Sequence, residues 1–119
     1  MTQHAVTVLV VGAGRTGAQV LRQLFKNPRL RILTLDPRDE PFAVSQGILE
    51  NVDFKEAFTP LTLDAVLKAA RPDLILLAST AEDLGLGEAA GVEMFSDALR
   101  DELATIADVP VIEVARASI

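Results

Sequence analysis

Three glycines near the N-terminus, Gly12, Gly14 and Gly17, follow the spacing G-x-G-x-x-G. This spacing can hold a pyrophosphate: the first glycine allows a sharp turn, the second lets phosphates approach the backbone, and the third lets a helix pack closely on the preceding strand. The N–H groups that open such a helix lack partners within it and lie at the positive end of its dipole. We therefore expect an anion site here, the alternative being a glycine turn that binds nothing.

Ala13, Arg15 and Thr16 stand between these glycines and belong to the same expected site. Arg15 lies inside the turn, where its guanidinium can contact a pyrophosphate. An exposed arginine in the first turn of a helix is an equally good interpretation.

Asp36 ends a second apolar run about 20 residues further on, where a dinucleotide-binding unit places an acid for the ribose hydroxyls. A carboxylate accepts hydrogen bonds from hydroxyls and repels a 2′-phosphate, so NAD is favoured over NADP. Arg38 weakens this preference, because a guanidinium tolerates a phosphate. The alternative is that Asp36 only forms a turn before Pro37.

A third apolar run, residues 73–80, ends in Ala78, Ser79 and Thr80. Ligands of open parallel sheets bind beyond the carboxyl ends of the strands, so small and hydroxyl-bearing residues there suit a dinucleotide. Equally, the two hydroxyl residues can cap the next segment. The expected cofactor-binding residues are Gly12, Ala13, Gly14, Arg15, Thr16, Gly17, Asp36, Arg38, Ala78, Ser79 and Thr80.

We predict no catalytic residue and no metal site. The chain has no cysteine and no tyrosine, and its one histidine, His4, lies in the N-terminal lead-in. Glu82 and Asp83 are adjacent, which is typical of a solvated acidic turn rather than a facing acid/base pair.

The composition is that of a globular chain with a full core. Of its 119 residues 50% are hydrophobic, and the net charge is −6. The negative charge argues against a nucleic-acid surface, and the five aromatic residues, all Phe, provide few platforms for stacking bases. No run is long enough to cross a bilayer and no export signal is present, so we expect one cytoplasmic domain over residues 1–119 without membrane insertion.

Strand and helix patterns alternate along the chain. Strands are expected at residues 6–11, 30–35, 52–54, 73–80 and 111–114. Helices are expected at 15–26, 41–49, between Thr59-Pro60 and Pro72, and at 88–107. This alternation predicts an α/β fold, a single doubly wound parallel sheet of about five strands in the order 3-2-1-4-5, with helices on both faces in three layers.

The glycine motif and Asp36 resemble those of the NAD(P)-binding Rossmann superfamily. Within it, the segment Leu77–Asp83 is most similar to nucleotide-binding domains of the TrkA-N or RCK type, which regulate potassium transport. That resemblance implies NAD(H) or adenine-nucleotide binding, dimerisation or a partner chain, and regulation rather than catalysis. The chain departs from it at Phe54–Ala57, where such domains usually have a Gly-Asp pair. The segment Pro28–Arg31 resembles saccharopine and homoserine dehydrogenase-like N-terminal domains.

Three hypotheses follow. The first is an NAD(H)-binding module without catalytic machinery, for which NADP or an adenine nucleotide is a further possible ligand. The second is the cofactor domain of a dehydrogenase whose substrate domain lies elsewhere. The third is a Rossmann-like interaction domain with an empty site.

Overall fold

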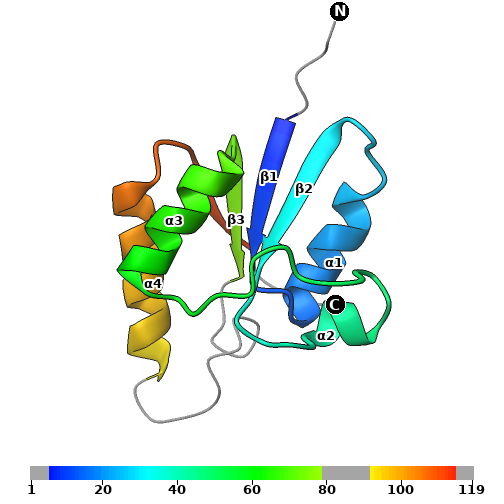
Figure 1. The fold of residues 1–119 in the computed structure, drawn as a ribbon, viewed down its shortest axis with the longest axis horizontal. Coiled ribbons are helices and arrows are strands. Elements are labelled where there is room, and N and C mark those ends of the chain that lie inside the picture. Colours follow the sequence, from blue (N-terminus) through cyan, green and yellow to red (C-terminus); the bar gives the residue numbers. More distant parts are fainter. Residues whose placement is uncertain (1–5, 79–91, 115–119) are drawn as a thin grey trace, which may run out of the picture.

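The computed structural model describes residues 6–78 and 92–114, which form a parallel four-stranded sheet flanked by helices (Figure 1). The strand order is β2-β1-β3-β4. The strands are β1 (Val6–Val11), β2 (Leu30–Leu35), β3 (Leu74–Ala78) and β4 (Val111–Val114). The helices are α1 (Arg15–Leu24), α2 (Phe42–Ser45), α3 (Pro60–Ala70) and α4 (Val92–Ile106).

The central strand β1 is buried on both faces, which explains its uninterrupted apolar sequence. Val8 and Val10 pack with α1 and α2 in one core cluster. Leu9 and Val11 point to the opposite face and pack in a second cluster with α3 and α4. Figure 1 shows the two pairs of helices on opposite sides of the sheet. The expected α/β fold with three layers is therefore present.

The prediction of a third strand at residues 52–54 is wrong. Phe54 makes a single parallel bridge to Leu35, with backbone bonds from Phe54 N to Thr34 O (2.9 Å) and from Asp36 N to Phe54 O (3.1 Å). The Asp53 carboxylate replaces further ladder bonds by accepting from Thr34 N (2.9 Å) and Thr34 Oγ1 (3.0 Å). The order 3-2-1-4-5 is thus reduced to β2-β1-β3-β4.

Several helices are also shorter than expected. Helix α1 ends at Leu24 rather than Lys26, and α2 has four residues instead of spanning 41–49. Gly47, at φ +75°, follows α2 and adopts a left-handed conformation that helices exclude. Helix α4 ends at Ile106, one residue before the expected end, and its expected beginning at residues 88–91 lies outside the described residues.

The beginning of α3 is where the sequence places it. Thr59 is the N-cap and Pro60 the first helical residue. Thr59 Oγ1 accepts from Thr62 N (3.2 Å), and Thr62 Oγ1 accepts from Thr59 N (3.0 Å), which completes a reciprocal capping box. In the part of the chain that the structure describes, no helix has the length and apolar character needed to cross a membrane.

Candidate functional site

The turn between β1 and α1 has the geometry that its glycines predict. Gly12 has φ +95°, which favours glycine, and its N–H donates to Leu35 O at 2.8 Å. A Cβ on Gly17 would lie 2.0 Å from the Gly12 carbonyl oxygen, so only glycine allows α1 to approach β1 this closely. The roles expected of Gly12 and Gly17 in the fold are therefore confirmed.

Helix α1 begins without a side-chain cap. Its N-cap residue, Gly14, is extended (φ −77°, ψ −153°) and has no side chain with which to bond the first turn. The first intrahelical bond runs from Ala18 N to Gly14 O (2.8 Å), and no acidic residue lies in the first turn of α1. The positive end of this helix dipole is thus not neutralised by a carboxylate of the helix itself.

The short helix α2 covers one side of this turn. Ala43 N donates to Ala13 O at 2.9 Å, and both alanines are fully buried. The exposed Arg15 places its guanidinium carbon 4.7 Å from the centroid of the Phe42 ring, within cation–π range. Thr16 is buried with 1% exposure. Sequence analysis missed the involvement of Phe42, because its separation from Arg15 along the chain gives no local signal.

Asp36 ends β2 directly beside the glycine turn, and its side chain is completely buried. Oδ2 accepts from Ala13 N (2.8 Å) and from Arg38 Nη2 (2.7 Å). Oδ1 accepts from Arg38 N and from Arg38 Nε, both at 2.9 Å. The guanidinium therefore bonds both carboxylate oxygens. The bond from Arg38 N forms a turn at Asp36, which is the alternative role that the sequence offers for this residue.

These contacts determine which acceptor positions of Asp36 remain for a ligand. An ionised carboxylate has about four acceptor positions, and the hydrogen bonds from Ala13 and Arg38 fill them. The start of α1 suits a phosphate, whereas Asp36 can accept ribose hydroxyls only after the Arg38 side chain moves away. Sequence analysis paired Arg38 with a 2′-phosphate and missed its pairing with Asp36, although the Asp-Pro-Arg sequence at 36–38 signals a turn that brings the two together.

The remaining expected site residues follow β3. Ala78 ends this strand, is 4% exposed and belongs to the core cluster on the α3 and α4 side. Ser79 and Thr80 lie outside the described residues. The chain leaves β1 through α1 on one face and reaches β3 through α3 on the other, so the winding direction changes between β1 and β3. In open α/β sheets this is where a crevice forms at the carboxyl ends of the strands.

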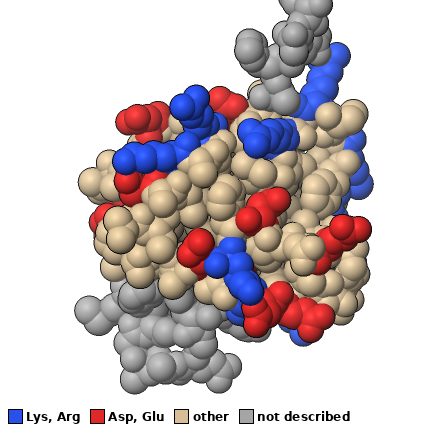
Figure 2. All heavy atoms as spheres, viewed as in Figure 1, with Lys and Arg blue, Asp and Glu red and all other residues tan. Residues whose placement is uncertain are grey.

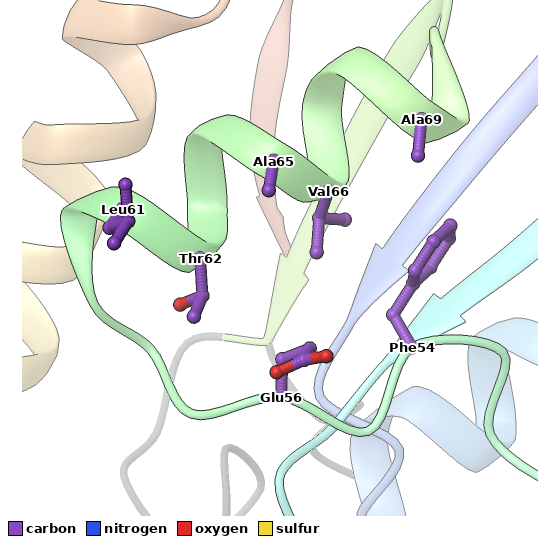
Figure 3. Close-up of a pocket in the computed structure, with 7 residues that line it drawn as sticks. All are labelled: Phe54, Glu56, Leu61, Thr62, Ala65, Val66 and Ala69. Atoms are coloured by element: carbon purple, nitrogen blue, oxygen red, sulfur yellow. The ribbon is translucent and has the colours of Figure 1, made fainter.

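A groove of about 300 Å³ lies along α3 (Figure 3). Its lining is mainly apolar, and Glu56 is the one charged side chain among the described residues of the lining. The residues that line it are Phe54, Glu56, Leu61, Thr62, Ala65, Val66 and Ala69. The Thr62 hydroxyl already accepts from Thr59 N in the cap of α3. The groove thus offers no cationic group to a phosphate, unlike the start of α1.

The charged side chains give no competing anion site on the face drawn in Figure 2. Lys and Arg are interspersed with Asp and Glu there, and no extended basic patch is visible among the described residues. Lys55 pairs with Asp39 (2.5 Å), Lys68 with Asp64 (2.9 Å) and Arg100 with Glu113 (3.0 Å).

Comparisons with known proteins leave this site as the main basis for a functional argument. No protein-family model matches the chain, and neither the curated proteins nor the solved structures include a significant match.

Proposed function

We propose that the chain binds a dinucleotide of the NAD(H) type at the carboxyl end of its sheet. The observation that carries this proposal is the start of α1, where a glycine N-cap and the absence of an acid in the first turn leave a helix N-terminus suited to phosphate. The buried carboxylate of Asp36 ends the neighbouring strand and supports a ribose position beside it.

In this proposal the backbone of residues 12–17 binds the pyrophosphate, and Asp36 accepts hydrogen bonds from the ribose. Arg15 is exposed at the first turn and supplies positive charge near the phosphates. Ala78 ends β3, and Ser79 and Thr80, which follow it in the sequence, are the further residues that we propose contact the ligand. The chain acts as a binding module, regulatory in the manner of TrkA-N or RCK domains, and works as a homodimer or with a partner chain.

Calorimetric titration with NAD⁺, NADH, NADP⁺, ATP and ADP tests the proposal. We expect binding of NAD⁺ and NADH, with the nucleotide recovered unchanged, because a module consumes nothing. Turnover of the bound cofactor would instead support a dehydrogenase domain. The absence of binding heat with all five ligands would contradict the proposal and leave the interaction-domain hypothesis.

Two variants locate the binding site. Gly14→Val places a branched side chain where the phosphates approach, and we expect binding to be abolished while the fold persists, since the extended backbone of Gly14 suits other residues. Ala104→Val, at an exposed position of α4, is the matched control and should bind normally. Asp36→Ala should weaken NAD binding by about 1–3 kcal/mol, through the loss of ribose hydrogen bonds.

A further inference from the structure

We propose that the Arg38 side chain is a latch on Asp36 that a ribose must open, so that Arg38 lowers the affinity for NAD⁺ instead of raising it. The inference rests on the proposed dinucleotide site. It concerns Asp36 and Arg38, the two charged residues that directly follow β2, where the ligand and the protein compete for one carboxylate.

The bonds at Asp36 divide into two kinds. The N–H groups of Ala13 and Arg38 belong to the backbone, so they stay in place as long as the turn keeps its conformation. Arg38 Nε and Nη2 belong to a side chain that is 32% exposed, so a change of rotamer, without movement of the backbone, separates them from Asp36. The carboxylate, with no exposed surface, has no such access to solvent.

Opening the latch releases one acceptor position on each carboxylate oxygen, because Nε bonds Oδ1 and Nη2 bonds Oδ2. A ribose presents two neighbouring hydroxyls, which match the two released positions in number. The ligand chemistry that this arrangement selects is therefore a vicinal diol, carried beside a phosphate that the start of α1 can hold.

The exchange is unfavourable by itself. A guanidinium that bonds both oxygens of a carboxylate makes charge-assisted hydrogen bonds, which are stronger than those from neutral hydroxyls. Part of the free energy of dinucleotide binding is consequently spent on separating Arg38 from Asp36. Removing the guanidinium while keeping the carboxylate should make the site bind more tightly.

The test compares NAD⁺ affinity by calorimetry in the wild type, Arg38→Ala and Arg38→Lys. We expect Arg38→Ala to bind about three- to tenfold more tightly, a change of up to roughly 1.4 kcal/mol. Arg38→Lys should lie between the two, because an ammonium cannot bond both oxygens in the planar arrangement of a guanidinium. Arg31→Ala, which removes an exposed arginine of β2, controls for net charge and should leave the affinity unchanged.

An affinity that is unchanged or weaker in Arg38→Ala, while the wild type binds NAD⁺, overturns the latch and leaves the proposed function standing. If the wild type and both Arg38 variants bind no dinucleotide, the proposed function fails and the latch with it. Binding that appears only in the Arg38 variants supports the latch and contradicts NAD binding by the wild type. Thermal unfolding of each variant identifies loss of the fold, and if Arg38→Ala does not fold, the affinity of Arg38→Lys decides.

Discussion

Helices α1 and α3 both begin at the carboxyl end of the sheet, yet only α3 has a side-chain N-cap. Helix α3 has Thr59, Pro60 and Thr62, which satisfy its first turn from its own sequence. Helix α1 has Gly14 at the corresponding position and no side-chain cap. The backbone N–H groups at the start of α3 are bonded by residues of the same turn, whereas the start of α1 is suited to an acceptor from another molecule.

The difference shows where the stability of each turn originates. The start of α3 is stabilised locally, within a few residues of sequence. The turn before α1 depends on distant residues: Leu35 accepts from Gly12, Asp36 accepts from Ala13, and Ala43 donates to Ala13. Because these tertiary contacts stabilise the turn, it needs no capping side chain of its own, and such a side chain would lie where a ligand could bind.

Gly17→Ala should break the α1 turn most severely. The new Cβ would lie 2.0 Å from the Gly12 carbonyl oxygen, a backbone atom that cannot move without displacing α1 from β1. We expect a loss of about 3 kcal/mol in the free energy of unfolding, measured by urea denaturation.

Gly47→Ala is the control for this variant. Its Cβ would meet no atom within 4 Å, and only the backbone conformation at φ +75° opposes it, at a cost of about 1 kcal/mol. Equal losses in the two variants would contradict the close approach of α1 to β1.

Asp36→Ala should destabilise the α1 turn by about 2 kcal/mol, since the buried N–H of Ala13 loses its acceptor and the ion pair between Arg38 and Asp36 is removed. Urea denaturation measures the loss, and faster hydrogen exchange of the Ala13 amide would locate it. Asp36→Asn, which retains one carbonyl oxygen, should lose less. A stability equal to that of the wild type would show that the turn does not depend on β2.

Thr59→Ala should cost about 1 kcal/mol, because α3 loses its N-cap acceptor. Thr105→Ala, in the exposed last turns of α4, removes only a hydroxyl bond to Asp101 O and serves as the matched control. If both variants lose the same free energy in thermal unfolding, the cap of α3 has no special role.

Gly14→Ser makes the start of α1 resemble that of α3. A serine hydroxyl at the N-cap can bond the first turn, and we expect stability to rise by a few tenths of a kcal/mol. The same hydroxyl competes with the phosphate, so calorimetry should show weaker NAD⁺ binding. Gly14→Ala, which adds bulk without an acceptor, should not gain stability. Increased stability with unchanged binding would place the ligand elsewhere.

The smallest effect is expected from Lys55→Met, in the segment before α3. The hydrogen bond from Lys55, and secondly its charge, lower the pKa of Asp39, and the same contacts raise the pKa of Lys55. Both groups are exposed, so the change in melting temperature at neutral pH should be barely measurable.

The pH dependence of this pair has a defined sign. The contribution of Asp39 is present above the ordinary aspartate pKa of about 3.9 and is lost as the pH falls through the lowered value. That of Lys55 is present below about 10.4 and is lost as the pH rises through its raised value. Melting curves of wild type and Lys55→Met should coincide in acid, and a difference that persists there would contradict the pairing.

The features predicted from the sequence are those that neighbouring residues determine. The buried apolar strand at Val6–Val11, the sharp turn at Gly12 and the cap at Thr59 each follow from residues close in the chain. The number of strands does not, because the alternation at 52–54 is interrupted by the Asp53 side chain, which bonds Thr34 on β2.

The expected site shows the same division. The glycine turn could be predicted from its own residues. The burial of Asp36 and its hydrogen bonds from Arg38 could not, because they depend on how the end of β2 packs beside the turn after β1. Sequence spacing identifies which groups are near one another, but it does not reveal which partner a carboxylate already holds.

The single bridge at Phe54 also affects whether the edge of the sheet at β2 can pair with a strand of another molecule. Thr34 N and Thr34 O at the outer edge of β2, and Asp36 N just beyond it, are bonded to Asp53 and Phe54 of the same chain. A strand from another molecule would have to displace them before it could extend the sheet there. The segment predicted as a third strand thus covers the carboxyl end of the β2 edge, where unpaired backbone groups would otherwise favour aggregation.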